Sequence, residues 1–292
     1  SSTGNAATSL AGHCALAGIS AVIFVPESAP EPKLAQLLAY GARVFAVQGS
    51  YDAAYNLCNE ACKRFGWYNR NCAINPVLVE GKKTAGMEIG EQTSAAATAN
   101  DFSGVPDWVV VSVGDGCSIA GVWKGLKHMY DVGVISKMPR LLGVQAEDVS
   151  PVAYALEHGL LPVADGDTDK STTIADSINV AVPRNWRKAV LALQESNGVM
   201  VCVSDERILE AIGLAGRHGV FAEPAAAASV AGLGFAVDGG IISGDERVLA
   251  MITGSGLKDT QAAIAATGGK NQSRLWRIKP DLDTVAGIIN SV

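Results

Sequence analysis

Short apolar runs alternate with helical patterns along this chain, and this alternation constrains its fold more than any other feature. Runs with the length and composition of buried strands occur at 21–25, 43–47, 108–113, 140–145, 200–203 and 248–253. Helical patterns occur at 5–18, 31–40, 51–65, 84–97, 119–130, 186–196, 205–218 and 257–267. Strands that alternate with helices usually pair in parallel, with helices on both faces of the sheet. The sequence therefore predicts an α/β fold.

A change of composition at "WYNRNCAIN", residues 67–75, is typical of a boundary between two lobes. We predict that residues 1–72 are the remaining part of a small α/β lobe and that residues 73–292 form a large one. Each lobe is expected to hold a mostly parallel sheet flanked by helices. The polar segment 165–182 has no long helical stripe, so we predict a loop that lies over a site.

Charge and cysteine content narrow the class of protein. The formal net charge is −6 and no basic block occurs, which argues against nucleic acids and acidic membranes as partners. No apolar run approaches the roughly 20 residues that a membrane helix needs. The six cysteines form no CxxC pair and are interpreted as reduced thiols of a cytoplasmic protein. Cys58 and Cys62 lie one helical turn apart, but nothing nearby completes a metal site, so no metal is predicted.

Three loops lie where a ligand of an α/β sheet would bind, between a strand and a helix or at a helix start. The first is "SSTGN" at 1–5, whose helix start offers backbone N–H groups and hydroxyls to an anion. The second, "GDGCS" at 114–118, resembles a phosphate-binding turn, although such a turn is more often only a tight turn. It is neither a P-loop nor a dinucleotide fingerprint. Its Asp115 is expected to point away from the anion. The third is "TGSG" at 253–256.

Five ordered blocks carry a resemblance to a known family: "SSTGNAATSLAGHCALAG", "INPVLVEGKKTAGMEIGEQ", "VSVGDGCSIAGVWKGLK", "FAEPAAAASVAGL" and "ITGSGLKD". Over essentially its whole length the chain resembles the threonine synthases of the tryptophan-synthase-β-like class (fold type II) of pyridoxal-phosphate enzymes. The resemblance implies pyridoxal 5'-phosphate as cofactor, a small amino-acid substrate, a homodimer and a place in threonine biosynthesis. In that family the Schiff-base lysine precedes the STGN loop. The catalytic lysine is therefore expected upstream of Ser1, and the chain is expected to be truncated at its N-terminus.

The resemblance also assigns roles to residues of the three loops. Asn5 is expected to donate to the phenolic oxygen of the cofactor, while Ser2 and Thr3 receive the carboxylate of the amino acid. Thr253 is expected to meet the pyridine nitrogen, although a lone threonine at a strand end more often bonds only to backbone. The cofactor phosphate is expected to lie on the backbone amides of Gly114, Asp115, Gly116, Cys117 and Ser118.

The chain departs from the family pattern where the substrate would bind. Threonine synthases commonly read Asn-Pro-x-Arg before the "EG" pair, whereas this chain has Leu78 in place of the arginine. We expect Asn75, Lys82 and Lys83 to bind substrate, with one lysine, Lys82, directed into the crevice and the other away from it. The reaction implied is conversion of O-phosphohomoserine and water into threonine and phosphate.

Two alternatives stay open: a threonine or serine dehydratase-like elimination, and an inactive remnant that still binds the cofactor. Ser255 stands where the family has a histidine, and this change adds weight to the alternatives. Glu223 is interpreted first as a residue that braces the start of a helix, and in this family it can also line the crevice.

Overall fold

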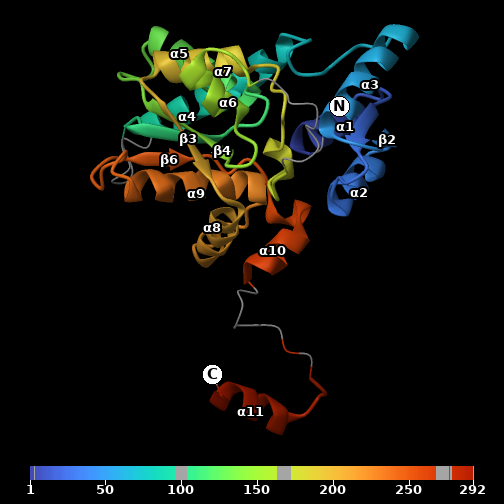
Figure 1. Ribbon diagram of the computed structural model, residues 1–292, viewed down its shortest axis with the longest axis vertical. Coiled ribbons are helices and arrows are strands. Elements are labelled where there is room, and N and C mark those ends of the chain that lie inside the picture. The colour runs from blue at the N-terminus through green and yellow to red at the C-terminus, as the bar shows by residue number, and fades with distance from the viewer. Residues whose placement is uncertain (3, 96–103, 163–171, 268–275, 277, 292) are drawn as a thin grey trace.

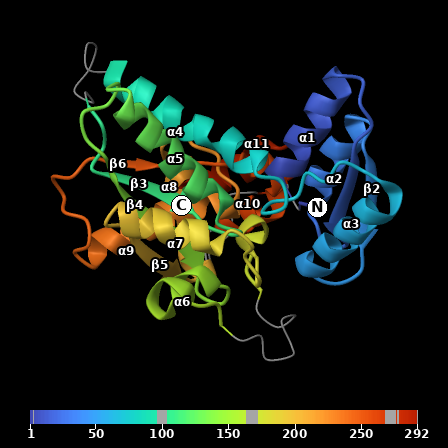
Figure 2. The ribbon, with the colours of Figure 1, turned by 90° about the horizontal axis from the view of Figure 1, so that it is seen from above.

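The computed structural model describes residues 1–292 except 3, 96–103, 163–171, 268–275, 277 and 292. The described residues form two separate parallel sheets, one of two strands and one of four. They occupy opposite sides of the molecule in Figure 2, each with its own helices. The predicted α/β fold with parallel sheets flanked by helices is therefore confirmed, while the boundary at residue 72 stays a prediction.

The N-terminal sheet pairs β1 (Val22–Pro26) with β2 (Arg43–Val47). Around it lie α1 (Asn5–Leu16), α2 (Glu31–Ala39) and α3 (Tyr51–Phe65). Helix α3 begins at Ser50, whose Oγ accepts a hydrogen bond from the Ala53 amide, as a capping serine does. It ends at Gly66, where φ is 67°, a left-handed conformation that glycine adopts without strain.

The larger sheet has the strand order β5-β4-β3-β6, with every neighbouring pair parallel. Its strands are β3 (Trp108–Ser112), β4 (Arg140–Ala146), β5 (Val199–Val203) and β6 (Val248–Ala250). Its helices are α4 (Val77–Ala95), α5 (Cys117–Asp131), α6 (Pro151–His158), α7 (Trp186–Glu195), α8 (Asp205–Arg217), α9 (Pro224–Asp238) and α10 (Thr260–Thr267). Short 3-10 turns lie at η2 (Asp176–Ile178) and η3 (Gly256–Lys258). Helix α11 (Leu282–Ser291) lies apart from both sheets (Figure 1).

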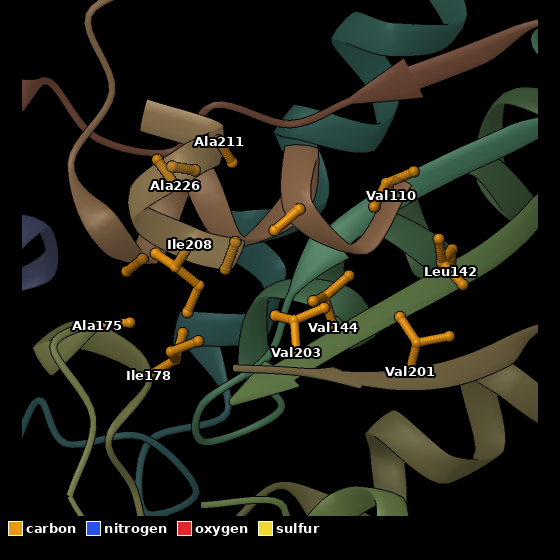
Figure 3. Close-up of a cluster of buried hydrophobic side chains, with 14 of the residues drawn as sticks. Val110, Leu142, Val144, Ala175, Ile178, Val201, Val203, Ile208, Ala211 and Ala226 are labelled. Carbon is orange, nitrogen blue, oxygen red and sulfur yellow. The ribbon is translucent and has the colours of Figure 1, made fainter. Parts of the chain in front are cut away.

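Both faces of this sheet are buried, which explains why its strands read as unbroken apolar runs. On one face Val110, Leu142 and Val201 belong to a core that also includes residues of α8 and α9 (Figure 3). On the other face Val109 and Leu141 belong to a core that α5 and α7 complete. Successive strand residues thus supply opposite cores, as the two-residue period of a strand requires.

Several predicted boundaries were wrong. The helix predicted at 84–97 begins at Val77, because Asn75 Oδ1 accepts a hydrogen bond from the Val77 amide and starts the helix earlier. The strand predicted at 248–253 ends at Ala250, and the helix predicted at 257–267 is η3 followed by α10. The sequence analysis missed α6 and α11. Of the loop predicted at 165–182, residues 165–171 lie outside the described residues, and the remainder contains η2.

Candidate functional site

A cavity of about 260 Å³ lies between the N-terminal ends of α1 and α5. The carboxyl end of β3 leads directly into it, which is where open α/β sheets bind their ligands. Its walls come from segments far apart in the sequence: residues 1–2, 4–6, 112–119, 176–178 and 180, with Tyr51, Arg70, Cys72, Lys82, Ala225 and Thr253. All of the predicted site residues of the GDGCS loop are among them, as are Ser2, Asn5 and Thr253.

The GDGCS loop presents an open helix start to this cavity. Gly116 precedes α5 with φ at 88° and no side chain caps the helix, so the amides of its first turn keep their hydrogen-bonding capacity for an anion. Gly114 has no room for a side chain, because a Cβ there would lie 3.0 Å from the Ile178 Cα and 3.1 Å from the Ser177 oxygen. Glycine at this position therefore lets η2 pack directly against the loop.

Asp115 binds protein groups beside the loop. Its Oδ1 accepts a hydrogen bond of 2.7 Å from the Arg184 amide, and its Oδ2 accepts one of 2.8 Å from Asn185 Nδ2. Burial raises the pKa of the Asp115 carboxyl, and the hydrogen bonds from residues 184 and 185 partly offset that effect. The carboxylate fastens the loop to the start of α7, which explains how an acidic residue is accommodated beside an anion site.

Asn5 joins the start of α1 to the third loop. Its Nδ2 donates to Glu223 Oε1 at 2.6 Å and to the Thr253 carbonyl at 3.3 Å, while its Oδ1 accepts from Lys258 Nζ. Burial lowers the pKa of the Lys258 ammonium. A Cβ at Gly254 would lie 2.0 Å from Glu223 Oε1, so only glycine permits this close approach. The side chain of Asn5 is thereby held at the edge of the cavity.

A buried lysine that the sequence analysis missed lies next to this cluster. Lys33 Nζ is 2.6 Å from Asp176 Oδ1 and 3.3 Å from Glu223 Oε2, and both Lys33 and Glu223 are only 1% exposed. Glu223 therefore bridges Lys33 and Asn5, in addition to preceding α9 as predicted. No sequence signal identified Lys33, because a lysine in a helical pattern is normally interpreted as solvated.

The predicted substrate residues do not all reach the cavity. Lys82 lines it and donates to Ser118 Oγ at 3.2 Å, whereas Lys83 is paired with Glu80 at 2.9 Å. Asn75 is not among the lining residues; its Nδ2 donates to the Tyr68 hydroxyl at 2.5 Å. Both lysines lie in the second turn of α4, whereas they were expected to open the helix.

Helix packing decides which lysine faces the cavity. Helix α4 packs against α5 at glycines of both helices: a Cβ at Gly125 would lie 2.0 Å from the Lys83 carbonyl oxygen, and one at Gly86 would lie 2.1 Å from the Val122 carbonyl oxygen. This contact holds the second turn of α4 against the start of α5. Lys82 consequently lies next to Ser118, and Lys83, which pairs with Glu80, does not line the cavity.

The remaining predicted residues lie at the rim. Ser2 lines the cavity, and its Oγ accepts a hydrogen bond of 3.2 Å from the Gly4 amide. Thr3 lies outside the described residues. Thr253 is exposed, unlike the buried strand-end threonine considered from the sequence, because β6 ends at Ala250. Its hydroxyl is therefore available to a ligand.

Two further polar residues of the wall were missed. Arg70 lines the cavity from the connection between α3 and α4, and its Nη1 donates to the Ala6 carbonyl at 3.3 Å. Ser112, at the end of β3, has a buried Oγ without a hydrogen-bond partner among the described residues. No motif marks either residue. A buried hydroxyl that lacks a partner indicates a ligand group, because such atoms are normally satisfied.

The donor set fits pyridoxal phosphate. The uncapped start of α5 suits the phosphate. The side-chain amide of Asn5 and the hydroxyl of Thr253 lie along the same cavity, where they can bind the polar atoms of the ring.

Among the described residues, no group of three or more His, Cys, Asp or Glu side chains is placed to hold a metal ion. No helix in the described part of the chain is long and apolar enough to cross a membrane.

Comparison with known proteins agrees with this geometry. Residues 1–254 match the model of the pyridoxal-phosphate dependent enzyme family. The threonine synthase of Methanocaldococcus jannaschii is 38% identical over 271 residues, which cover 91% of this chain and 64% of that protein. The threonine synthase of Bacillus sp. is 33% identical over 293 residues, covering 100% of this chain and 76% of that protein. Diaminopropionate ammonia lyase from Escherichia coli has a similar fold, with a TM-score of 0.73 at 16% identity over 91% of this chain and 69% of that one.

The chain spans 64% of the length of the first of these relatives.

Proposed function

Because this chain belongs to the pyridoxal-phosphate-dependent enzyme family and is a relative of the threonine synthases, we propose that it acts as a lyase that converts O-phosphohomoserine and water into threonine and phosphate. The observation that carries the proposal is that one cavity is lined both by the uncapped start of α5 and by the cationic side chains of Arg70 and Lys82. O-Phosphohomoserine needs donors for its own phosphate beyond those that hold the cofactor.

When bound, pyridoxal phosphate stabilises negative charge at the α carbon of an amino acid. The chain binds and orients this group at both ends. The amides of Gly114–Ser118 would hold the phosphate, and Asn5 would donate to the ring oxygen by giving up the longer of its two Nδ2 hydrogen bonds, the one to the Thr253 carbonyl. Thr253 offers a neutral hydroxyl to the ring nitrogen, which leaves that nitrogen less protonated than a carboxylate would. A milder electron sink of this kind favours elimination and replacement on the substrate side chain.

Substrate phosphate would be bound by Lys82 and Arg70, which line the same cavity from two different segments. These two cations take the place of the arginine that Leu78 replaces. Each charge-assisted hydrogen bond is worth ~1.5–3 kcal/mol, so removal of one should weaken substrate binding by about one to two orders of magnitude. Ser2 remains available for the substrate carboxylate at the start of α1.

The experiment compares the variants Lys82→Ala and Lys83→Ala. Each is expressed together with any residues that the gene encodes before Ser1. Release of phosphate and formation of threonine are measured against O-phosphohomoserine concentration, and pyridoxal phosphate affinity is measured separately. We expect Lys82→Ala to raise KM about 10- to 100-fold without changing cofactor affinity. Lys83→Ala is the matched control, since its ammonium is paired with Glu80 and does not line the cavity.

Three results would contradict the proposal. Weaker cofactor binding by Lys82→Ala, with KM unchanged, would assign Lys82 to the cofactor phosphate beside Ser118. If the enzyme preferred free threonine or serine, and neither lysine variant changed KM, the result would favour the dehydratase-like elimination. The observation that supports this alternative is Leu78, which stands where threonine synthases commonly have an arginine. Cofactor binding without turnover of any of these amino acids would favour an inactive protein.

We propose further that the protein is a homodimer of the cytoplasm. Its six cysteines form no disulfide, which fits a reducing compartment. Large apolar side chains, among them Leu16 and Val132, are exposed and available to a second copy. Light scattering of the purified protein tests the dimer, and a monomer at micromolar concentration would refute it.

A further inference from the structure

The side-chain amide of Asn5 is held between two charged groups. Its Nδ2 donates to Glu223 Oε1 at 2.6 Å, and its Oδ1 accepts from Lys258 Nζ. The two ends of an amide have almost the same shape, so the groups around them decide which end lies where. A carboxylate only accepts hydrogen bonds, and an ammonium only donates them. Glu223 and Lys258 therefore fix the amide with its N–H donors on the Glu223 side.

This arrangement requires that the Glu223 carboxylate stays ionised. Glu223 is only 1% exposed, and its Oε2 has no hydrogen-bond partner among the described residues. Lys33 Nζ lies 3.3 Å from this oxygen and supplies the opposite charge. A buried carboxyl group that lacks a nearby cation takes up a proton rather than stay charged. A neutral carboxyl group donates as well as accepts, so it would no longer select the N–H end of Asn5.

Lys33 is fixed by residues of the cavity wall. Its Nζ donates to Asp176 Oδ1 at 2.6 Å and to Ser177 Oγ at 3.2 Å, and both acceptors belong to η2. Asp176 and Ser177 line the cavity, whereas Lys33 and Glu223 do not. Lys33 is also only 1% exposed. It therefore does not touch a ligand in the cavity and acts on one only through its neighbours.

We propose that Lys33 is a positioning residue, which acts through Glu223 to hold the Asn5 amide as a donor to the ring oxygen of pyridoxal phosphate. This inference rests on the proposed function, because the cofactor supplies that oxygen. Asn5 lines the cavity, and its hydrogen bond to the Thr253 carbonyl, at 3.3 Å, is the one that it would exchange for the ring oxygen. Without the charge of Lys33 the amide is free to turn, and its oxygen would then face the ring oxygen and repel it.

The test measures binding of pyridoxine 5'-phosphate and of inorganic phosphate by titration calorimetry, so it needs no turnover. Pyridoxine phosphate has the ring, its oxygen and the phosphate, but it lacks the aldehyde that reacts with lysines. Lys33→Met and Asn5→Ala are made singly and together, in protein that includes any residues encoded before Ser1, and dialysis against hydroxylamine removes any bound aldehyde cofactor.

The expected result is a loss that depends on Asn5. Each single variant should bind pyridoxine phosphate about tenfold more weakly, which is the effect of one hydrogen bond to a charged oxygen. Both should bind inorganic phosphate as the wild type does. The double variant should bind pyridoxine phosphate as Asn5→Ala does, because Lys33 acts only through that amide. A general loss of structure would instead add to the effect of Asn5→Ala.

Two further variants complete the experiment. If Lys33→Met does not fold, Glu223→Gln takes its place, because it removes the same ion pair from the other side and should show the same dependence on Asn5. The matched control is Asp52→Asn. Asp52 of α3 pairs with Arg184, which lies just before α7, at 2.5 Å; both side chains are less than one-fifth exposed and neither residue lines the cavity. Asp52→Asn should leave the affinity for pyridoxine phosphate unchanged.

Three outcomes would overturn this inference: a further tenfold loss when Lys33→Met is added to Asn5→Ala, weaker binding of inorganic phosphate by Lys33→Met, or an equal loss in Asp52→Asn. A different result would contradict the proposed function as well. If the wild type bound inorganic phosphate but not pyridoxine phosphate, the cavity would not be a cofactor site, and both proposals would be wrong.

Discussion

Replacement of Lys33 by methionine tests whether the buried ion cluster holds the two sides of the site together. Lys33 lies on α2, while its partners Asp176 and Glu223 belong to η2 and the start of α9. Lys33→Met keeps most of the side-chain volume and removes the charge together with the hydrogen bonds that Nζ donates to Asp176 and Ser177. It leaves the Glu223 carboxylate buried, with Asn5 Nδ2 as its remaining close hydrogen-bond donor.

The expected loss can be worked from the distances. At the 3.3 Å that separates Lys33 Nζ from Glu223 Oε2, the Coulomb attraction is about 5 kcal/mol for an effective dielectric constant of about 20. This is a ceiling, because the variant also avoids the cost of burying an ammonium. Removal of one partner of a buried pair typically costs about 3–5 kcal/mol. Asp176 is 24% exposed and can be rehydrated, so we expect a loss of about 3 kcal/mol.

The assay is urea unfolding followed by far-UV circular dichroism and tryptophan fluorescence, and the free energy is used only if both transitions coincide. The double variant Lys33→Met with Glu223→Gln should recover about half of the loss, since it leaves no buried anion at position 223. Lys137→Met is the control, because Lys137 is 46% exposed and its pair with Asp107 should be worth less than about 1 kcal/mol. If Lys33→Met cost no more than Lys137→Met, the cluster would not stabilise the fold as argued.

Three further predictions test the loop, the helix contact and one ion pair. Gly116→Asp should reduce pyridoxal phosphate affinity at least tenfold in a fluorescence titration, because a Cβ at this positive φ would lie 3.0 Å from the Ala189 Cβ and from the Asn185 carbonyl oxygen and would displace the loop that offers its amides to the phosphate. Gly133→Asp, at a positive φ with nothing within 4 Å, should not reduce it. Gly125→Ala should lower the free energy of unfolding by about 1–3 kcal/mol, since its Cβ would meet the Lys83 carbonyl at 2.0 Å; an unchanged urea midpoint would contradict the close packing of α4 on α5. The pKa of the Asp107 carboxyl is lowered in the folded protein, mainly by the hydrogen bond from Lys137. The ionised carboxylate therefore stabilises the folded state above the unfolded pKa of about 3.9, and this stabilisation is lost as the pH falls through the folded pKa. Asp107→Asn should therefore destabilise the protein at pH 7 and have a smaller effect at pH 3, and equal urea midpoint shifts at both values would contradict this.

The sequence predicted most of the elements because their signals are local. The apolar runs at 43–47 and 108–113 coincide closely with β2 and β3, and the pattern at 51–65 coincides with α3, whose cap and final glycine are adjacent in the chain. The start of α4 was missed although Asn75, which accepts the hydrogen bond from the Val77 amide, is local in the sequence. Helix α4 contains Gly81, Gly86 and Gly90, which weaken a helical pattern, yet these glycines belong to a helix that packs closely against α5.

The sequence by itself determined which loops carry polar groups at strand ends and helix starts, since those residues are consecutive: Ser1 to Asn5, Gly114 to Ser118, and Thr253 to Gly256. Only the tertiary structure decided which side chains join them in one cavity. Arg70, Lys82 and Cys72 reach it from other segments, and Lys33 is buried with Glu223 only because the fold brings this residue of α2 beside the residue that precedes α9. The physical reason is that secondary structure depends on residues a few positions apart, whereas burial and charge pairing depend on distances in space that the chain sets only when it is folded.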